Sequence, residues 1–255
     1  MTMINQILKD RVVFVTGSAR RVGKAILLAF AEQGANVVIH HSNSDDAAAE
    51  TAAEAKAMGA DTLIVKGNHA HYDEIAANFE TITQHFGRLD VLVNSASIFL
   101  KGDLLEIPPD EWEQVMAINL SAPFYCTRFA GRIMRDNGIP GSIINIGDNG
   151  GLRPWSTRPH HSVSKAGVVM LTQVSARALA TYQIRVNCIV PGPILPSADM
   201  SEQRWEELKS KLPLKRTGDP GDVARAAVFL STNEFITGAI LRVDGGEFLG
   251  AQFDS

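Results

Sequence analysis

Cysteine is scarce in this chain: Cys126 and Cys188 are the only two, and each stands in an apolar stretch far from the other. Two such cysteines cannot form the disulfide framework of a small secreted domain, so we expect a reducing compartment. No run approaches the roughly 18 consecutive apolar residues of a membrane-spanning helix. Residues 1–10 lack the basic start and apolar run of a secretory signal. These absences predict a cytoplasmic protein with no membrane partner.

A charge excess is also lacking. The net charge is -4 and the pI is about 6.0, whereas a nucleic-acid-binding surface calls for a basic patch. The seven histidines include His69, His71 and His85, which fall in loops or helix ends and are spaced unlike any metal-binding set, while His40 and His41 alternate at a strand end. We therefore expect neither a nucleic-acid partner nor a metal site.

What the chain does contain is an alternation of short apolar runs with longer segments of helical period. Runs that are apolar throughout and alternate with helices predict a Rossmann-type α/β fold, a doubly wound parallel sheet of about seven strands with helices on both faces. No linker divides the chain, so we expect one domain over residues 1–255, with a substrate lid at about 193–214 around a polar helix at Ser201–Lys211. The predicted strands are Val12–Thr16, Asn36–His40, Thr62–Val65, Val91–Val93, Ser142–Ile146, Arg185–Ile189 and Ile240–Val243.

The first predicted strand runs directly into the segment Thr16-Gly17-Ser18-Ala19-Arg20-Arg21-Val22-Gly23, which opens a helix ending near Gly34. Glycines at such a turn let the backbone approach a pyrophosphate, and the free N–H groups of the helix N-terminus attract its charge. Two glycines alone are equally typical of a tight turn, but the strand before and the helix after supply the context that a dinucleotide site requires. The segment predicts a dinucleotide-binding turn formed by Gly17, Arg20, Arg21, Val22 and Gly23.

The end of the second predicted strand lacks an acidic residue. It reads His40-His41-Ser42-Asn43-Ser44, and the first acid is Asp45. A carboxylate there would bind both ribose hydroxyls of NAD and repel a 2′-phosphate, whereas hydroxyls, an amide and nearby arginines favour the phosphate. The sequence therefore favours NADP, with Ser42, Asn43 and Ser44 near the 2′-phosphate. Ser44 also suits the N-cap of the next helix.

Further motifs follow in a recognisable order. They are Asn94-Ser95-Ala96-Ser97, Asn119, Lys165, Pro191-Gly192 and Val243-Asp244-Gly245-Gly246. On these residues the chain resembles the short-chain dehydrogenase/reductase family from about Arg11 to Gly246. The resemblance implies that a nicotinamide cofactor contacts a further set of residues, namely Asn68, Asn94, Ser95, Ala96, Ser97, Lys165, Pro191, Gly192 and Ile194.

Three positions make the chain most similar to the pteridine reductases and dihydromonapterin reductases of that family. Arg21 stands where most members have a glycine, Ser97 (with Phe99 after it) replaces another glycine, and Asp148 stands where most have a serine. The resemblance implies that Ser97 and Phe99 line the substrate site, with the ring of Phe99 stacked on a pterin. A lone phenylalanine after a strand is as often part of a core. Trp205 can cover the substrate or simply pack the lid down.

The family's proton donor is a tyrosine four residues before the lysine, so that both share one helix face. Here Lys165 is present, but His161 occupies that position, with Asp148 thirteen residues earlier as the family register requires. The resemblance implies that Lys165 binds the nicotinamide ribose, that Asp148 orients the substrate and that Asn119 supports Lys165 through water. None of the three tyrosines, Tyr72, Tyr125 and Tyr182, is nearby in the sequence.

His161 admits three interpretations. An imidazole has an ordinary pKa of about 6.5, nearer neutrality than the roughly 10 of tyrosine, so His161 can act as a general acid with Asp148. Its side chain is shorter, however, and a misplacement of about 1 Å can cost about a hundredfold in rate. The site can instead run an altered chemistry, or bind dinucleotide without turnover.

We therefore expect an NADPH-dependent oxidoreductase that reduces a C=N or C=O bond of a small, pterin-like substrate. The alternatives are a reductase of another carbonyl compound and a redox-silent NADP-binding protein. The resemblance also implies a homotetramer in which the helix carrying Lys165 packs against its mate. A partly apolar stripe on that helix suits such an interface, although it can equally face the sheet. The stripe is Ala166, Val169, Met170, Gln173, Val174 and Arg177.

Overall fold

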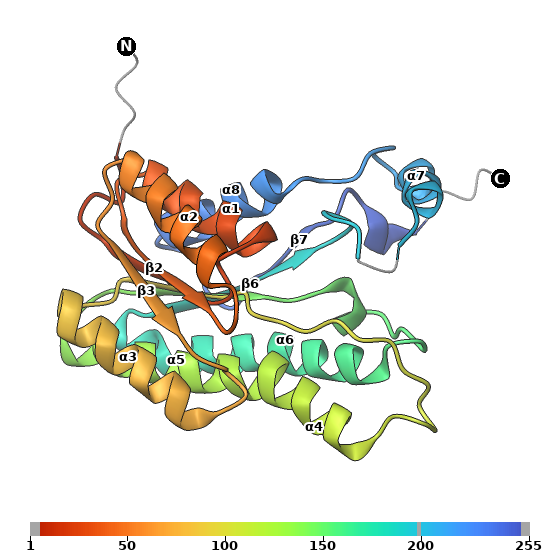
Figure 1. Cartoon of the computed structure of the whole chain (residues 1–255), viewed down its shortest axis with the longest axis horizontal. Coiled ribbons are helices and arrows are strands. Elements are labelled where there is room, and N and C mark those ends of the chain that lie inside the picture. Colours follow the sequence, from red (N-terminus) through yellow and green to blue (C-terminus); the bar gives the residue numbers. More distant parts are fainter. Residues whose placement is uncertain (1–5, 198–199, 251–255) are drawn as a thin grey trace, which may run out of the picture.

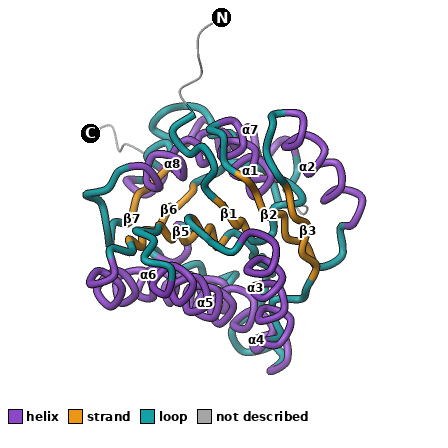
Figure 2. Tube along the Cα trace, turned by 90° about the vertical axis from the view of Figure 1, so that its left-hand side faces the viewer, coloured by secondary structure: helices purple, strands orange, loops and turns teal. Residues whose placement is uncertain are grey.

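The structure is a computed structural model that describes residues 6–197 and 200–250. Within these residues, seven parallel strands form one sheet in the order β3-β2-β1-β4-β5-β6-β7 (Figure 1, Figure 2). The predicted doubly wound sheet is thereby confirmed, since the strand order reverses between β1 and β4. The strands are β1 (Val12–Val15), β2 (Asn36–His41), β3 (Thr62–Lys66), β4 (Val91–Asn94), β5 (Ser142–Ile146), β6 (Arg185–Pro191) and β7 (Ile240–Val243).

Helices cover both faces of the sheet, with α1, α2 and α8 on one face and α3 to α6 on the other (Figure 1). A π-helical turn (Ala117–Ser121) joins α4 to α5, and 3-10 turns occur at Asn149–Gly151, Ala180–Tyr182 and Glu247–Leu249. Among the helices of the described residues, none is long and apolar enough to cross a membrane. The helices are α1 (Arg21–Glu32), α2 (Asp45–Ala57), α3 (Tyr72–Phe86), α4 (Pro109–Met116), α5 (Ala122–Asp136), α6 (Pro159–Leu179), α7 (Glu202–Lys211) and α8 (Pro220–Thr232).

The central strands are apolar throughout because helices cover both of their sides. All four residues of β1 are buried. Val13 and Val15 pack toward α1 and α8, whereas Phe14 belongs to the second core layer, which also includes residues of α3 and α5. This pattern is typical of strands in a buried parallel sheet.

The ends of the helices follow local chemistry. Helix α1 buries Ile26, Leu27 and Phe30 and is followed by Gly34, whose φ of +86° suits glycine. Ser44 is the N-cap residue of α2 as predicted, although its side chain makes no capping hydrogen bond. The polar helix predicted in the lid is α7; of the proposed lid, residues 198 and 199 lie outside the described residues.

The strand order locates the ligand-binding region. In doubly wound sheets, ligands bind beyond the carboxyl ends of the strands where the order reverses. Here that point lies between β1 and β4, so the loops after these two strands form the crevice.

Candidate active site

The turn between β1 and α1 requires glycine at two positions. Gly17 has a φ of +66°, and a Cβ on it would lie 2.9 Å from the Cα of Ala96. A Cβ on Gly23 would collide with the carbonyl oxygen of Gly17. The turn therefore packs its backbone against the loop after β4 and brings the N-terminus of α1 to the crevice.

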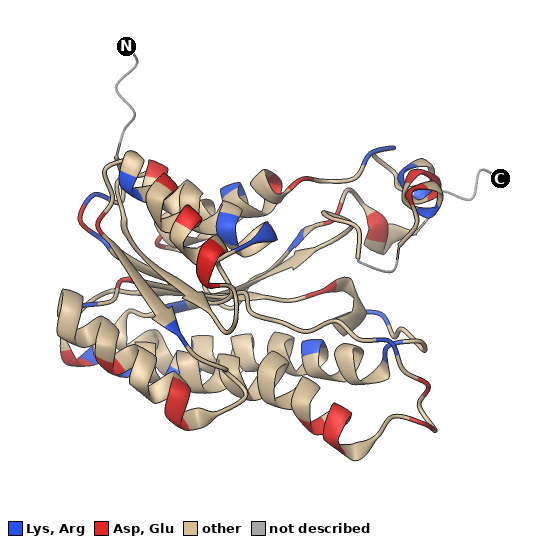
Figure 3. Ribbon diagram, in the orientation of Figure 1, with Lys and Arg blue, Asp and Glu red and all other residues tan. Residues whose placement is uncertain are grey.

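Two arginines stand at the N-terminus of α1. Arg20 is the N-cap residue, and Arg21 has a φ of +55°, a backbone conformation that residues with side chains rarely adopt. The guanidinium of Arg21 donates a hydrogen bond to the carbonyl oxygen of Pro196 at 3.0 Å, which ties this turn to the loop after β6. The first turn of α1 contains no acidic residue, so the helix N-terminus and both arginines favour an anionic ligand (Figure 3).

A cavity of about 360 Å³ lies beside this turn. Among the described residues that line it there is no carboxylate. Asp45, the first acid after β2, instead accepts hydrogen bonds from Lys66 at 2.9 and 3.0 Å. The predicted cofactor residues that meet at the cavity are Gly17, Arg20, Arg21, Val22, Gly23, Ser42, Asn68, Ser95, Ala96 and Ser97.

The other predicted cofactor residues lie outside this lining. Asn94 is buried, and its amide nitrogen donates to Asn145 Oδ1 at 2.8 Å. The amide nitrogen of Asn145 in turn donates to Thr172 Oγ1 at 2.9 Å. The side chain of Asn94 thus joins β4 to β5 and α6 rather than lining the cavity. Asn43 and Ser44 follow β2, Lys165 lies on α6, and Pro191, Gly192 and Ile194 lie at or after the end of β6.

His40 and His69 form part of the cavity wall. Nδ1 of His40 accepts the backbone N–H of Gly17 at 2.9 Å, so its Nε2 carries the proton and donates to the carbonyl oxygen of Gly67 at 3.0 Å. The ring of His69 stacks on that of His40 with 3.7 Å between the centroids. Nε2 of His69 is 3.1 Å from Asn78 Oδ1. Two neutral imidazoles therefore hold the dinucleotide-binding turn against β2 and β3.

Burial keeps both rings neutral. Burial and, to a lesser degree, the neighbouring His69 together lower the pKa of His40 to about 3. Burial likewise lowers the pKa of His69 to about 4, against the hydrogen bond that its ring donates to Asn78 Oδ1, which favours the protonated form. Sequence patterns indicated no role in a site for these two histidines, yet both line the cavity.

His161 lies in the first turn of α6 and is 2% exposed. Its Nε2 lies 3.4 Å from Asp148 Oδ2, while Asp148 Oδ1 accepts the backbone N–H of Gly150 at 2.7 Å. Neither ring nitrogen of His161 has a hydrogen-bond partner among the described residues. The structure thus brings the two predicted residues within ion-pair distance without an aligned hydrogen bond.

Lys165 lies one helical turn after His161. Its Nζ donates to the carbonyl oxygen of Ile146, at the end of β5, at 2.9 Å. Burial lowers the pKa of Lys165, and the charge of Asp148 acts in the opposite direction. An ammonium has three N–H donors, so two remain for ligand or solvent beyond this bond.

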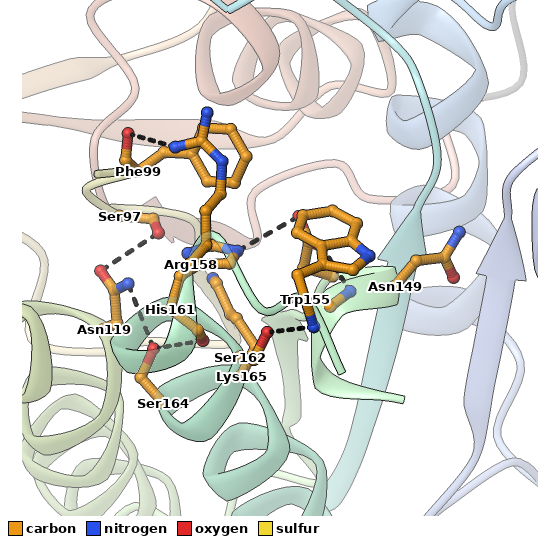
Figure 4. A network of polar contacts seen from close by, with 12 residues as sticks. Ser97, Phe99, Asn119, Asn149, Trp155, Arg158, His161, Ser162, Ser164 and Lys165 are labelled. Atoms are coloured by element: carbon orange, nitrogen blue, oxygen red, sulfur yellow. Dashed lines mark hydrogen bonds and ion pairs between the residues drawn. The ribbon is translucent and has the colours of Figure 1, made fainter. Parts of the chain in front are cut away.

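Asn119 lies in the π-helical turn, a feature frequent at functional sites. Its Oδ1 accepts the hydroxyl of Ser97 at 3.1 Å and the backbone N–H of Ile98 at 2.9 Å. Its Nδ2 donates to the carbonyl oxygen of Ile98 at 3.0 Å and to Ser164 Oγ at 3.3 Å (Figure 4). Its direct contacts therefore join α6 to the loop after β4; a water-mediated role toward Lys165 stays a prediction.

Aromatic side chains surround His161 (Figure 4). The ring of Phe99 meets that of His161 edge to face, with centroids 4.6 Å apart, and the indole of Trp155 lies nearly parallel to the imidazole at 6.1 Å. The guanidinium of Arg158 lies 3.7 Å from the centroid of the Phe99 ring. One face of Phe99 is therefore covered by the chain itself. Trp205 lies half-buried on α7 and is not among the ring contacts of the described residues.

No group of three or more His, Cys, Asp or Glu residues within the described part of the chain is arranged to hold a metal ion. Both cysteines are unpaired and buried, and burial raises the pKa of each thiol. The predicted catalytic groups at the site are the side chains of His161, Asp148, Lys165 and Asn119.

Comparison with known proteins decides the family. A family profile described as enoyl-(acyl carrier protein) reductase matches residues 17–247. L-rhamnose 1-dehydrogenase (NAD(P)(+)) of Azotobacter vinelandii is 35% identical over 96% of this chain and 100% of its own length. The 3-oxoacyl-[acyl-carrier-protein] reductase of Staphylococcus aureus is 35% identical over 92% of this chain and 97% of its own. The chain belongs to the short-chain dehydrogenase/reductase family.

Solved structures of similar proteins agree with this assignment. A putative short-chain alcohol dehydrogenase from Sinorhizobium meliloti superposes with a TM-score of 0.91 at 28% identity, over 96% of this chain and 99% of the other. A blue fluorescent protein from a metagenomic library, solved in complex with NADPH, gives a TM-score of 0.87 at 33% identity, over 94% and 98%. The chain is therefore an oxidoreductase of the short-chain type.

Members of this family bind a nicotinamide cofactor, and the turn after β1 fits one. The positive φ of Gly17 and the contact that a Cβ on Gly23 would make leave room only for backbone at the place where a pyrophosphate approaches. The N-terminus of α1 and the two arginines supply the charge that such a group needs.

Sequence patterns did not indicate several residues of this short-chain dehydrogenase/reductase site. Trp155 and Arg158 lie in the sequence between Asp148 and His161. Their place between two predicted catalytic residues could have indicated that they belong to the site. His40 and His69 are too far apart in sequence for any spacing rule to connect them. Their role depends on the pairing of β2 with β1 and β3.

Proposed function

We propose that this short-chain dehydrogenase/reductase uses NADPH to reduce a C=O or C=N bond of a small molecule, with His161 as the proton donor. The cofactor, when bound, supplies a hydride from its nicotinamide ring. The chain supplies the proton, the orientation and an enclosure that excludes water. The alternative of a redox-silent NADP-binding protein is the outcome against which this proposal is tested.

The buried imidazole of His161 carries this proposal. A buried polar group without a hydrogen-bond partner costs about 1–3 kcal/mol, so its presence needs an explanation. Both ring nitrogens of His161 are in this condition, and Asp148 lies 3.4 Å from Nε2. The carboxylate of Asp148 would hold the ring in place, and a substrate oxygen or nitrogen would accept a proton from it.

The other proposed roles follow from the contacts. Lys165 would bind the nicotinamide ribose with the donors that it does not use on Ile146. Asn119 would support Lys165 through water while it holds the loop of Ser97. Asp148 would hold His161 and the substrate. The dinucleotide would lie on the cavity residues named above, with Asn94, Pro191, Gly192 and Ile194 as further proposed contacts.

The choice of NADPH is supported by the charge at the end of β2. The cavity lining contains Arg20, Arg21 and Ser42 and no carboxylate, and Asp45 is paired with Lys66. A 2′-phosphate near Ser42, Asn43 and Ser44 would meet two arginines, while Asp46 and Glu50 line a neighbouring pocket that also includes Lys24.

A flat substrate, as in the pteridine reductases, is supported by the rings beside His161. Phe99 is 40% exposed, and one of its faces is taken by Arg158, so a planar group would stack on the other. Ser97 Oγ lies in the same loop and, because its proton is donated to Asn119, would accept a hydrogen bond at the edge of such a group. Trp205 on α7 would close the site from the lid.

A substrate panel tests the function. NADPH oxidation is measured with dihydropterins, quinones, ketones and oxoacyl thioesters, and NADP⁺ reduction is measured with L-rhamnose, because the relatives named above include a sugar dehydrogenase and an oxoacyl reductase. We expect turnover with at least one class, and the preferred class identifies the substrate type. NADPH binding without turnover on every member would overturn the proposal in favour of a redox-silent protein.

We also propose that the chain forms a homotetramer through α6. The charged residues of this helix are Lys165 and Arg177 (Figure 3), and Met170 and Val174 are each 58% exposed, so the predicted stripe faces away from the sheet. We expect Val174→Asp to lower the mass measured by light scattering, while Leu105→Asp, at an exposed leucine elsewhere, leaves it unchanged. A monomeric wild-type chain across a wide concentration range would contradict this assembly.

A further inference from the structure

His160, next to His161, has a side chain that is completely buried. Its Nδ1 accepts the backbone N–H of His161 at 3.0 Å, and its Nε2 lies 3.0 Å from Oε1 of Glu111 on α4. Because Nδ1 is an acceptor, a neutral ring carries its proton on Nε2 and donates it to the carboxylate. The hydrogen bonds thus connect Glu111, through the ring of His160, to the backbone N–H of His161, the proposed proton donor.

The hydrogen bond to the His161 N–H replaces an ordinary helix cap. His161 is the third residue of α6, so its N–H is one of the four that lack a partner within the helix. The N-cap residue, Arg158, makes no side-chain capping bond. The imidazole of His160, which lies within the first turn, therefore accepts the N–H that a capping side chain would otherwise accept.

The carbonyl group of His161 is held from the other side. The hydroxyl of Ser164 donates to it at 2.8 Å, and Asn119 donates to Ser164 Oγ at 3.3 Å (Figure 4). Side chains thus hold both polar groups of the His161 backbone. Neither ring nitrogen of His161 has a hydrogen-bond partner among the described residues, so the position of the ring depends on this backbone, on the nearby carboxylate of Asp148 and on packing against Phe99.

We propose that His160 and Glu111 are positioning residues that fix the backbone of the proton donor, His161, for catalysis. This inference rests on the proposed function. A proton donor displaced by about 1 Å loses about a hundredfold in rate, so a side chain that fixes its backbone affects turnover directly. Glu111 anchors the pair to α4, which adjoins the loop that carries Phe99.

Two substitutions of His160 separate its two hydrogen bonds. In His160→Asn, the side-chain oxygen occupies the δ position, so it can accept the His161 N–H, but it cannot reach Glu111. In His160→Gln, the polar group occupies the ε position, so it can reach Glu111 but leaves the His161 N–H without its acceptor. Glu111→Gln retains an acceptor for His160, and Glu113→Gln, at an exposed carboxylate on the same helix, is the matched control.

The experiment measures kcat and KM for NADPH-dependent reduction of phenanthrenequinone, a flat dicarbonyl probe, together with NADPH affinity, hydrogen exchange of the His161 amide and the unfolding midpoint. We expect His160→Gln to lower kcat about tenfold or more and to expose the amide to exchange. NADPH affinity should remain within about twofold, because the two hydrogen bonds of His160 described above involve no residue of the cavity lining. His160→Asn should retain most of the turnover and of the amide protection, and Glu113→Gln should match the wild type.

Two results would overturn the positioning role: equal turnover in His160→Gln and the wild type, or equal losses in His160→Asn and His160→Gln that follow the unfolding midpoint. The proposed function fails in a different way. If His161→Phe keeps the wild-type turnover, His161 is not the donor, whatever the substitutions of His160 do. A loss in His161→Phe alone, with both His160 variants unaffected, leaves the donor in place and removes only the positioning role.

Discussion

The two ends of the crevice are built in opposite ways. At the β1 end, His40 accepts the N–H of Gly17 and donates to Gly67, so both nitrogens of the imidazole are satisfied. At the β5 end, the equally buried imidazole of His161 has no hydrogen-bond partner for either nitrogen within the described part of the chain, and a carboxylate lies 3.4 Å away. His40 is held neutral in a fixed orientation by its two hydrogen bonds, whereas His161 retains hydrogen-bonding capacity for a ligand.

This difference separates binding from chemistry. A satisfied polar network makes a rigid surface for a cofactor, whereas an unsatisfied group at the reacting end gains its partner only when a substrate is present. Each end can therefore be altered with little effect on the other, except where one residue serves both. The predictions below test this separation.

Lys165 is the residue that should break the separation. It is assigned to the ribose of the nicotinamide, the ring that supplies the hydride, so we expect Lys165→Ala to weaken NADPH binding and also to lower turnover on the order of 10² to 10³-fold. Steady-state kinetics and fluorescence titration on the same preparation measure both. Unchanged NADPH affinity would remove the ribose contact from the assignment.

The neutral histidines of the β1 end should make the fold sensitive to acid. The pKa of His40 is about 3 and that of His69 about 4 in the folded state, against an ordinary value of about 6.5, so the unfolded chain takes up protons first as the pH falls. Their contribution to stability is complete above about pH 6.5 and is lost progressively below it. At about pH 5 the loss is about 2 kcal/mol for each histidine. Urea unfolding at about pH 6.5 and at about pH 5 measures this loss of stability.

A matched pair of variants isolates this effect. His69→Gln should remove about half of the difference between the two pH values, whereas His71→Gln, at an exposed histidine, should leave it intact. Burial raises the pKa of Glu247, so that carboxyl group acts in the opposite sense and reduces the net difference. Equal free energies of unfolding at both pH values, in the wild type and both variants, would contradict the neutral pair.

Cofactor choice is the smallest expected effect and concerns the β1 end alone. NADPH should bind at least about tenfold more tightly than NADH, which corresponds to about 1.4 kcal/mol. Ser42→Asp places a carboxylate where NAD-binding sites have one, so it should reverse the preference, while Ser42→Asn should retain it. Fluorescence titration with both cofactors measures the ratio. Equal affinities in the wild type would refute the assignment of the 2′-phosphate.

The fold could be predicted because each strand carries its own signal. The β-type run Arg185–Ile189, in which polar and apolar residues alternate, predicted β6, which extends to Pro191, and Asn36–His40 predicted β2, which ends at His41. The glycine turn was equally readable, because its geometry allows no side chain at Gly23. These features depend on neighbouring residues or on the alternation of helix and strand.

The rest of the site could not be predicted because it depends on contacts between distant segments. Asn94 belongs to a recognised motif, but its side chain contacts residues of β5 and α5, and this arrangement is defined only by the packed sheet. His160 was adjacent to His161 in sequence, yet its role arises from Glu111 on another helix. Helix periodicity does not specify which side chain will accept a given N–H.

Substitution of His161 tests the central claim most directly. His161→Phe keeps a ring of similar size at the site and removes the proton donor, and the NADPH dissociation constant and the turnover number are measured on the same sample. The account predicts that turnover falls at least about a hundredfold while the dissociation constant stays within about twofold, because the dinucleotide contacts lie elsewhere. Wild-type turnover in His161→Phe would contradict the account, since the proton would then come from Asp148 or from water.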